Sequence, residues 1–167
     1  MNKNFLIILI VVFLAIAIYF YINESKDSQE QLGKGTLVFK EIKDLNTKYI
    51  SGQTWPPQIT VSEASELVCN QTAMESSVSE RVYKDNVNGQ EYCVTASSQG
   101  AAGSVYTEYS YSTIKFDKLV TLDFTLRFVN CYNYDGAEQT ACISERETFN
   151  PSNNIDEIVS SAEYVLE

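Results

Sequence analysis

The sequence contains no histidine. This absence excludes the Ser–His and Cys–His nucleophile systems, in which an imidazole takes the proton from the nucleophile. It also argues against a zinc site, because no two of the four cysteines have C-x-x-C spacing. No pair of carboxylates is arranged as the two facing acids that a glycosidase needs. We therefore expect a protein that is not an enzyme and that holds no metal or cofactor.

Basic residues are scarce: the chain has 12 Lys and Arg against 22 Asp and Glu, for a formal charge of −10. All the acidic residues and 11 of the basic ones follow Asn23, so this part carries 11 − 22 = −11. An acidic chain disfavours nucleic acid and anionic lipid as partners and is compatible with a basic partner. The more common explanation of such a charge is solubility alone.

Charge is absent from residues 5–22, FLIILIVVFLAIAIYFYI, which also lack Gly and Pro. A transmembrane helix needs about 20 apolar residues. Lys3 precedes this span and acidic residues follow it, so we expect a single-pass cell-membrane protein with a cytoplasmic N-terminus and an extracytoplasmic C-terminal domain. A cleaved signal peptide is the alternative, since Ala15-Ile16-Ala17 has the A-x-A form. Cleavage there would leave an apolar new N-terminus, and we favour an uncleaved anchor.

The four cysteines, Cys69, Cys93, Cys131 and Cys142, all follow the apolar span. An even number of cysteines in an exported domain indicates disulfides, and four cysteines allow three connectivities. We prefer Cys69–Cys93 with Cys131–Cys142, because each bond closes a local loop between neighbouring elements.

The segment CYNYDGAEQTAC, residues 131–142, partly follows a calcium-loop pattern. The first and twelfth positions of that pattern need acidic ligands, and here both are cysteines. We interpret the segment as a disulfide-closed surface loop that turns at Asp135-Gly136. Calcium binding through Asn133, Asp135 and Glu138 is the alternative.

Three regions follow one another along the chain. Residues 1–23 form the expected anchor, residues 24–54 a linker, and residues 55–167 a β-rich domain. Within the linker, apolar residues at positions 38, 42, 45 and 49 have helical spacing, which predicts a short amphipathic helix over residues 37–50. Trp55-Pro56-Pro57 then favours an extended segment where the main domain begins.

The main domain contains runs that are typical of strands. Asn88-Gly89 is a strong signal for a two-residue hairpin turn. Apolar and polar residues alternate over residues 119–129, which predicts a strand with one buried and one wet face. Its expected hairpin partner is residues 105–115, with the turn at residues 116–118. The residues predicted to face the core are Val120, Leu122, Phe124, Leu126 and Phe128.

The C-terminal part has helical periodicity in Ile155, Ile158, Val159 and Ala162. Asn154 and Glu157 fit the first positions of a capped helix. The expected fold class is therefore mainly β (α+β). It combines an N-terminal transmembrane helix, a short amphipathic helix, a small antiparallel sheet or sandwich, and a C-terminal helix.

Residues 97–104, SSQGAAGS, are small or flexible and lie between two expected strands. Without a lysine they do not form a phosphate loop. The more common role of such a stretch is a tight connection. The functional hypothesis is that its bare backbone and the neighbouring tyrosines contact a protein partner in the cell envelope, because tyrosine is enriched at interaction hot spots. The candidate binding residues are Ser98, Gly100, Ala101, Gly103, Ser104, Tyr106, Tyr109 and Tyr111.

Two resemblances follow from these residues. The runs YCVTASSQGAAGSVYTEYSYS and CYNYDGAEQTACISERETF resemble a group of short, uncharacterised, signal-anchored exported bacterial proteins with a small disulfide-containing β domain, over most of residues 55–165. That resemblance implies no activity. Residues 102–106, AGSVY, are similar to the Ser-Gly-x-x-Tyr-type loop of membrane-anchored C-type lysozyme inhibitors, without the serine before the glycine. This second resemblance implies that the 97–106 loop enters an enzyme cleft.

Overall fold

A computed structural model describes residues 35–40, 42, 44–71 and 80–166 of the chain. The expected membrane anchor, residues 5–22, lies outside these residues. Within the part of the chain that is described, no helix is both long and apolar enough to cross a membrane. The chain divides into two compact units, Met1–Val38 with Tyr164–Glu167, and Phe39–Glu163. The described part of the first unit consists of β1 (Gly35–Val38) and, from Tyr164 on, β8 (Glu163–Leu166), which pair with each other.

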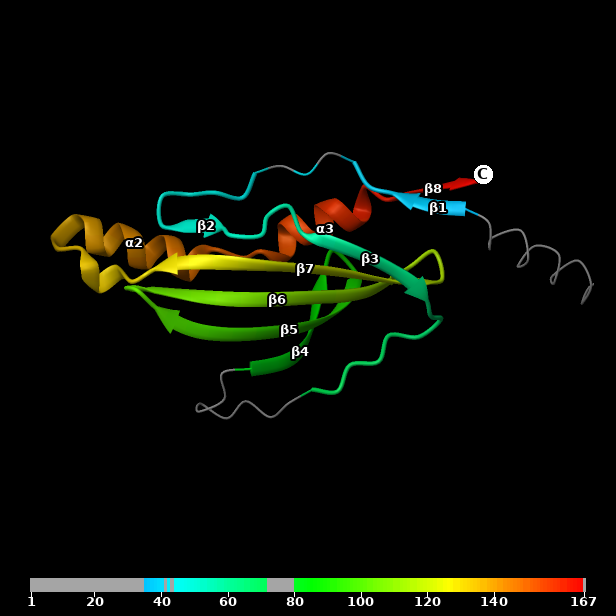
Figure 1. The fold of residues 1–167 in the computed structure, drawn as a ribbon, viewed down its shortest axis with the longest axis horizontal. Helices are drawn as coiled ribbons and strands as arrows, with labels where there is room; N and C mark the ends of the chain where they lie inside the picture. Colours follow the sequence, from blue (N-terminus) through cyan, green and yellow to red (C-terminus); the bar gives the residue numbers. More distant parts are fainter. Residues whose placement is uncertain (1–34, 41, 43, 72–79, 167) are drawn as a thin grey trace, which may run out of the picture. The chain divides into compact units, whose positions relative to one another are not determined.

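The second unit is built on a six-stranded antiparallel sheet, which confirms the mainly β prediction (Figure 1). The central strands are long and follow one another as hairpins, in the spatial order β4-β5-β6-β7. Two short strands, β2 and β3, pair with the free edge of β7. The bounds are β2 (Ile50–Gly52), β3 (Gln58–Glu63), β4 (Glu80–Val87), β5 (Gln90–Ala101), β6 (Ser104–Lys115) and β7 (Lys118–Val129).

One face of this sheet, here called the inner face, carries the core. The five apolar residues of β7 predicted to point inward are at most 9% exposed. The cross-strand register aligns them with Tyr111 of β6 and with Tyr92 and Val94 of β5, which are also buried. Helix α3 (Ser152–Ser160) covers part of this face with Ile155, and Figure 1 shows the helix on one side of the sheet. The predicted alternation of β7 is therefore confirmed.

Three two-residue turns connect the long strands: Asn88-Gly89, Ala102-Gly103 and Phe116-Asp117. Both residues of each turn have positive φ, as type I′ hairpin turns require. The turn predicted at Asn88-Gly89 is confirmed. The turn predicted over residues 116–118 is one residue shorter, because Lys118 already belongs to β7.

The helix predicted over residues 37–50 is wrong. Residues 36–38 belong to β1, the described residues from 39 to 49 are irregular, and β2 begins at Ile50. Leu45 and Tyr49 are buried, as the spacing suggested, but by an extended chain rather than by a helix. The Asp44 carboxylate accepts hydrogen bonds from the backbone and side-chain amides of Asn46, a local turn that competes with helix formation.

The predicted C-terminal helix is confirmed as α3, although it begins two residues before Asn154. The Asn150 side chain accepts a hydrogen bond from the Ser152 backbone N–H at 3.0 Å and so supports this start. A second helix, α2 (Gly136–Thr148), follows a 3₁₀ turn, η2 (Cys131–Asn133). The sequence interpretation missed α2, because it treated Asp135-Gly136 as a turn inside a loop.

Both preferred disulfides are present. Cys69 is bonded to Cys93 with their Cα atoms 5.4 Å apart, and Cys131 is bonded to Cys142 at 5.5 Å. The first bond ties the irregular segment that follows β3 to β5. The second closes η2 onto α2, and Tyr49 and Tyr134 pack around it. Both Cα separations lie within the ordinary range for protein disulfides.

Candidate binding site

The stretch predicted as a bare loop is almost entirely strand. Ser97–Ala101 pairs with β6 residue by residue, and only Ala102 and Gly103 lie outside the ladder. Gly103 has φ +73°, and an added Cβ there would lie 3.1 Å from the Asn133 amide nitrogen. The Gly103 carbonyl accepts hydrogen bonds from the Asn130 backbone and the Asn133 side chain. Glycine at this position therefore serves a hairpin turn that is packed against η2.

The other predicted binding residues are divided between the surface and the interior. Gly100 and Ala101 are exposed at the end of the hairpin, and Gly100 has no atom within 4 Å of an added Cβ. Ser98 bonds the Thr107 hydroxyl on the inner face. Ser104 is 5% exposed and accepts a hydrogen bond from the Arg127 guanidinium.

The three predicted tyrosines also differ from one another. Tyr106 is half-buried on the face opposite the core. Tyr109 stacks on Phe124 at 5.3 Å between ring centroids. Tyr111 is 1% exposed, and its hydroxyl is bonded to Ser152. Tyr111 and Ser104 thus have almost no free surface with which to contact a partner.

Three tyrosines of the inner face have a raised pKa. Burial raises the pKa of Tyr109 to about 12. Burial also raises the pKa of Tyr111, and it raises that of Tyr92, whose hydroxyl donates to the Asp156 carboxylate at 2.7 Å. These groups are protonated at neutral pH, and the hydroxyls of Tyr92 and Tyr111 are hydrogen-bonded to α3.

The alternative calcium site is not assembled. Asn133 donates to the Gly103 carbonyl, and Glu138 forms an ion pair with Lys48 at 2.9 Å. Asp135 precedes α2 as its N-cap residue. Among the residues that the structure describes, no three His, Cys, Asp or Glu side chains are grouped to hold a metal ion.

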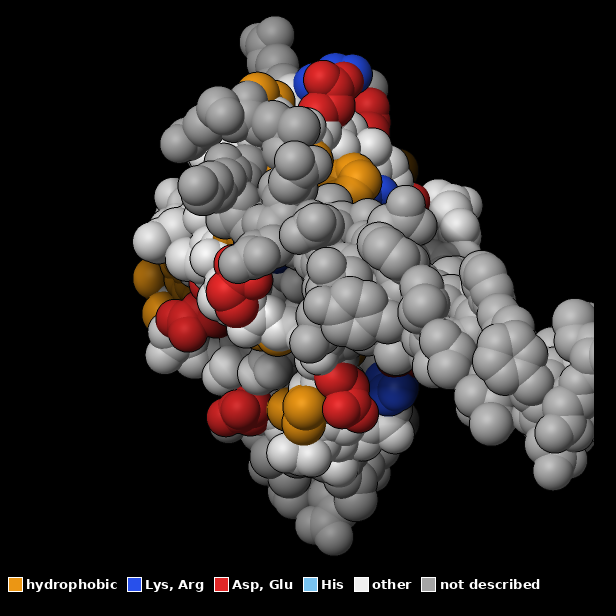
Figure 2. All heavy atoms as spheres, turned by 90° about the vertical axis from the view of Figure 1, so that its right-hand side faces the viewer, with side chains coloured by type: hydrophobic (Ala, Val, Ile, Leu, Met, Phe, Trp, Pro, Cys, Tyr) orange, Lys and Arg blue, Asp and Glu red, His pale blue; other side chains and the backbone are white. Residues whose placement is uncertain are grey.

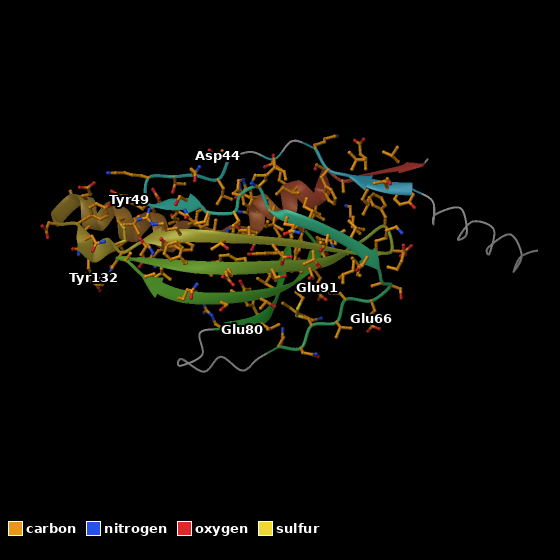
Figure 3. The ribbon with its side chains drawn as sticks, viewed as in Figure 1. Asp44, Tyr49, Glu66, Glu80, Glu91 and Tyr132 are labelled. Carbon is orange, nitrogen blue, oxygen red and sulfur yellow. A yellow bond between two sulfur atoms is a disulfide. The ribbon has the colours of Figure 1, made fainter. Side chains whose placement is uncertain are left out.

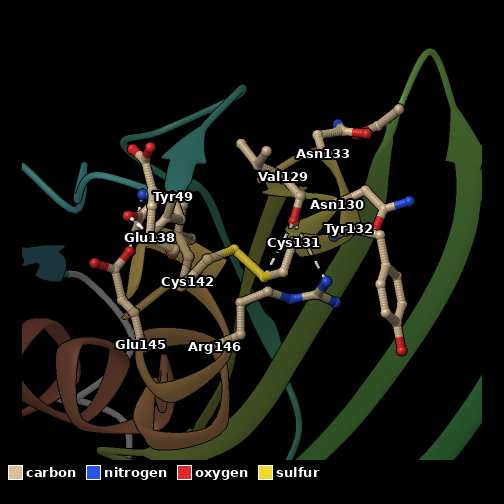
Figure 4. Close-up of a disulfide and its surroundings, with 12 residues drawn as sticks. Tyr49, Val129, Asn130, Cys131, Tyr132, Asn133, Glu138, Cys142, Glu145 and Arg146 are labelled. Atoms are coloured by element: carbon tan, nitrogen blue, oxygen red, sulfur yellow. Dashed lines mark hydrogen bonds between the residues drawn. A yellow bond between two sulfur atoms is a disulfide. The ribbon is translucent and has the colours of Figure 1, made fainter. Parts of the chain in front are cut away.

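Different residues lie on the two sides of the Cys131–Cys142 disulfide (Figure 4). Tyr49, Glu138 and Glu145 lie on one side, where Glu145 accepts a hydrogen bond from the Tyr49 backbone. On the other side the ring of Tyr132 extends away from the bond and is 85% exposed. A shallow hollow of about 370 Å³ lies there, lined by Asn130, Cys131, Tyr132, Ile143, Arg146 and Glu147.

A larger hollow lies on the other face of the sheet, here called the outer face. It has a volume of about 760 Å³. Its floor follows from the register, because residues paired across neighbouring strands form rows. One row is Glu80, Ser97, Glu108 and Thr125, and the next is Thr95, Ser110, Asp123 and Gln58. Most positions of these two rows carry a hydroxyl or carboxyl group, and together the rows extend over five strands. Trp55, Pro56, Tyr109 and Phe124 complete the lining, and we call this surface the outer groove.

A chain segment and a disulfide border the outer groove. The segment 54–56 joins β2 to β3 and lines one side. Beyond the second row, Cys93 is bonded to Cys69 and ties the residues after β3 across that end of β5. Figure 3 shows Glu80 at the start of β4, on the opposite margin of the sheet. The groove is therefore bordered on one side by the 54–56 segment and at one end by a disulfide.

The outer groove contains three carboxylates, Glu80, Glu108 and Asp123, and no Lys or Arg lines it. All three are exposed, and none forms an ion pair with a described Lys or Arg. Figure 2 shows that acidic side chains of described residues are also spread over another side of the molecule, beside few basic ones.

The nearest basic side chains of the outer face are engaged away from the groove. Arg127 lies one row beyond Glu108, and its guanidinium donates to Ser104, in the row after that. At the other end of the groove, Lys84 lies one row beyond the row of Asp123. It forms an ion pair at 2.9 Å with Glu91, which lies one row further from the groove. The negative charge of the groove is therefore not neutralised by its neighbours.

The sequence interpretation missed the outer groove, although it identified the polar face of β7. Rows such as Glu80–Ser97–Glu108 join residues from three strands, and they appear only when the register is known. No protein-family model matches this chain, and the comparisons with curated proteins and with solved structures found no similar protein.

Proposed function

We propose that this chain is a non-catalytic binding protein of the cell envelope that holds a protein partner in its outer groove. In this proposal, residues 5–22 anchor it in the cell membrane as a single pass, with the C-terminal domain on the extracytoplasmic side. The main support for this proposal is the outer groove. One face of the sheet is covered by the core, and the other face is hollowed and lined with hydroxyl and carboxyl groups, so it presents a contact surface. The two disulfides support an oxidising compartment.

Rigidity supports a binding role as well. Most of the groove floor belongs to the three long strands β5, β6 and β7, which are joined by tight turns, and a disulfide fixes one end of it. A surface that is already in its bound shape loses little conformational entropy on binding. A partner can therefore be held by modest polar contacts.

Site-specific photo-crosslinking in the native membrane tests this proposal. A photoreactive phenylalanine analogue is placed in the full chain at one of three positions: Ser110 on the groove floor, Ala101 at the hairpin end, or Ile143 on α2. We expect a discrete crosslinked product from Ser110 and none from Ile143. Absence of a product from Ser110, with equal expression of the three variants, would contradict the proposal.

The hairpin end is the second candidate surface, because Gln99, Gly100, Ala101, Ala102 and Gly103 are all exposed. It corresponds to the lysozyme-inhibitor-like hypothesis, in which the 97–106 segment enters an enzyme cleft. Gly100→Val tests it cleanly, since no atom lies near the added side chain and the φ angle of this glycine is not positive. Inhibition of a C-type lysozyme by the full chain, and its loss in Gly100→Val, would favour this surface over the groove.

A further inference from the structure

The outer groove has a chemistry that selects among partners. Its three carboxylates lie on different strands, Glu80 on β4, Glu108 on β6 and Asp123 on β7. Neighbouring strands are about 4.8 Å apart, so the row position of Glu80 is separated from that of Glu108 by about 10 Å. Asp123 is the diagonal neighbour of Glu108, about 7–8 Å away. The three carboxylates are therefore spread along the groove, and this spacing matches a chain that presents several separated cations.

We propose that the outer groove binds a lysine- or arginine-rich polypeptide segment of the partner. This inference rests on the proposed function and names the partner's chemistry. The charge of the groove favours a cationic partner. The groove contains three carboxylates without a described ion pair, and the neighbouring Arg127 and Lys84 bind Ser104 and Glu91 instead. A cationic segment would supply positive charges opposite these carboxylates, where no Lys or Arg lines the groove.

The hydroxyl groups of the floor fit the same occupant. Ser97 and Ser110 lie beside the carboxylates in their rows and are half-buried, so they can accept hydrogen bonds from ammonium or guanidinium groups. An anionic occupant would meet three like charges, which is strongly unfavourable. The groove therefore discriminates by repulsion as well as by attraction.

Fluorescence anisotropy tests the inference with the full chain in nonionic detergent. The probe is a labelled peptide of alternating lysine and serine, and the reference is a peptide of alternating glutamate and serine. We expect saturable binding of the lysine peptide at low ionic strength, weakening as salt is added, because exposed charges are screened. No binding of the lysine peptide would overturn the inference.

Matched variants locate the binding. Glu80→Gln, Glu108→Gln and Asp123→Asn together remove the groove carboxylates. Glu66→Gln, Asp117→Asn and Glu147→Gln together remove the same charge from exposed positions outside the groove. We expect the groove variant to lose about tenfold in affinity, the combined strength of three exposed ion pairs, and the control variant to lose much less. Equal losses in both variants would overturn the inference, because they would indicate attraction to net charge alone.

The two proposals fail in distinguishable ways. A crosslinked partner at Ser110 together with no affinity for the lysine peptide would overturn the cationic partner and leave the groove as a binding site. Spermine separates a polypeptide from a small polyamine: if spermine displaces the lysine peptide at an equal concentration of cationic groups, the groove recognises free polyamines and the polypeptide inference is overturned. Failure of spermine to displace it supports the inference.

Discussion

The two faces of the sheet are made from the same strands but have opposite composition. On the inner face, β7 contributes Leu122 and Leu126, both fully buried, and tyrosine hydroxyls are bonded to α3. On the outer face the same strand contributes Asp123 and Thr125 to the groove. Because side chains alternate along a strand, residues one position apart serve stability on one side and recognition on the other.

This difference predicts where substitutions act. Changes on the inner face should lower the free energy of unfolding and affect binding only through folding. Changes on the outer face should leave stability nearly unchanged and alter binding directly.

The largest contrast is expected between two neighbours in β7. Leu126→Ala removes a fully buried side chain and should cost about 2–5 kcal/mol of unfolding free energy. Thr125→Ala removes only a half-buried hydroxyl and methyl at the groove and should cost less than about 1 kcal/mol. Urea unfolding followed by circular dichroism measures both. Similar costs would contradict the assignment of the faces.

High pH should unfold the domain through its inner face. The pKa of Tyr109 is about 12 in the folded state, and burial also raises those of Tyr92 and Tyr111. Each of these groups favours folding fully below the ordinary tyrosine pKa of about 10, and this contribution is lost as the pH rises toward the folded value. Tyrosinate absorbance should therefore rise together with loss of circular dichroism between about pH 10 and 12. Complete titration of all tyrosines with the fold intact would contradict this.

A pair of tyrosine variants sharpens the comparison at single hydroxyl groups. Tyr92→Phe removes the donor to Asp156, which is 5% exposed and, among the side chains that the structure describes, then retains only its bond from Asn88. We expect a loss of about 1–3 kcal/mol in unfolding free energy. Tyr106→Phe on the outer face should change it by less than about 0.5 kcal/mol. Thermal unfolding of the two variants and of the parent measures both changes in unfolding free energy.

The smallest effects are expected at the turns that join the strands. Asp117 has φ +55°, a region that costs an ordinary residue about 1 kcal/mol. Asp117→Gly should therefore stabilise the domain slightly, whereas Gly103→Ala should destabilise it, because φ is +73° there and Asn133 is close. Opposite shifts in the midpoint of urea unfolding are the expected result. Shifts of the same sign would contradict the description of these turns.

The inner face was largely predictable from the sequence. The alternation along β7, the Asn88-Gly89 turn and the local pairing of the cysteines are signals carried by neighbouring residues. The helix over residues 37–50 was predicted wrongly, because Leu45 and Tyr49 have helical spacing but are buried by an extended segment against other parts of the fold.

Helix α2 could have been found from Asp135 and Glu138, which have the spacing of a capping pair. The cysteine at each end of the segment drew the interpretation toward a loop. The outer groove was not predictable in this way. Its rows depend on which residues of β4, β5, β6 and β7 lie opposite one another, and this register is a property of the whole sheet.

The most direct test of the central claim is to map backbone amide shifts of the isotopically labelled full chain in detergent micelles while the lysine–serine peptide is added. The account predicts that the shifts concentrate on the rows of the outer groove, around Ser97, Glu108 and Asp123, and leave buried Tyr92 and Leu122 unmoved. Shifts centred on Ala101–Gly103, or spread evenly over acidic residues throughout the domain, would contradict it.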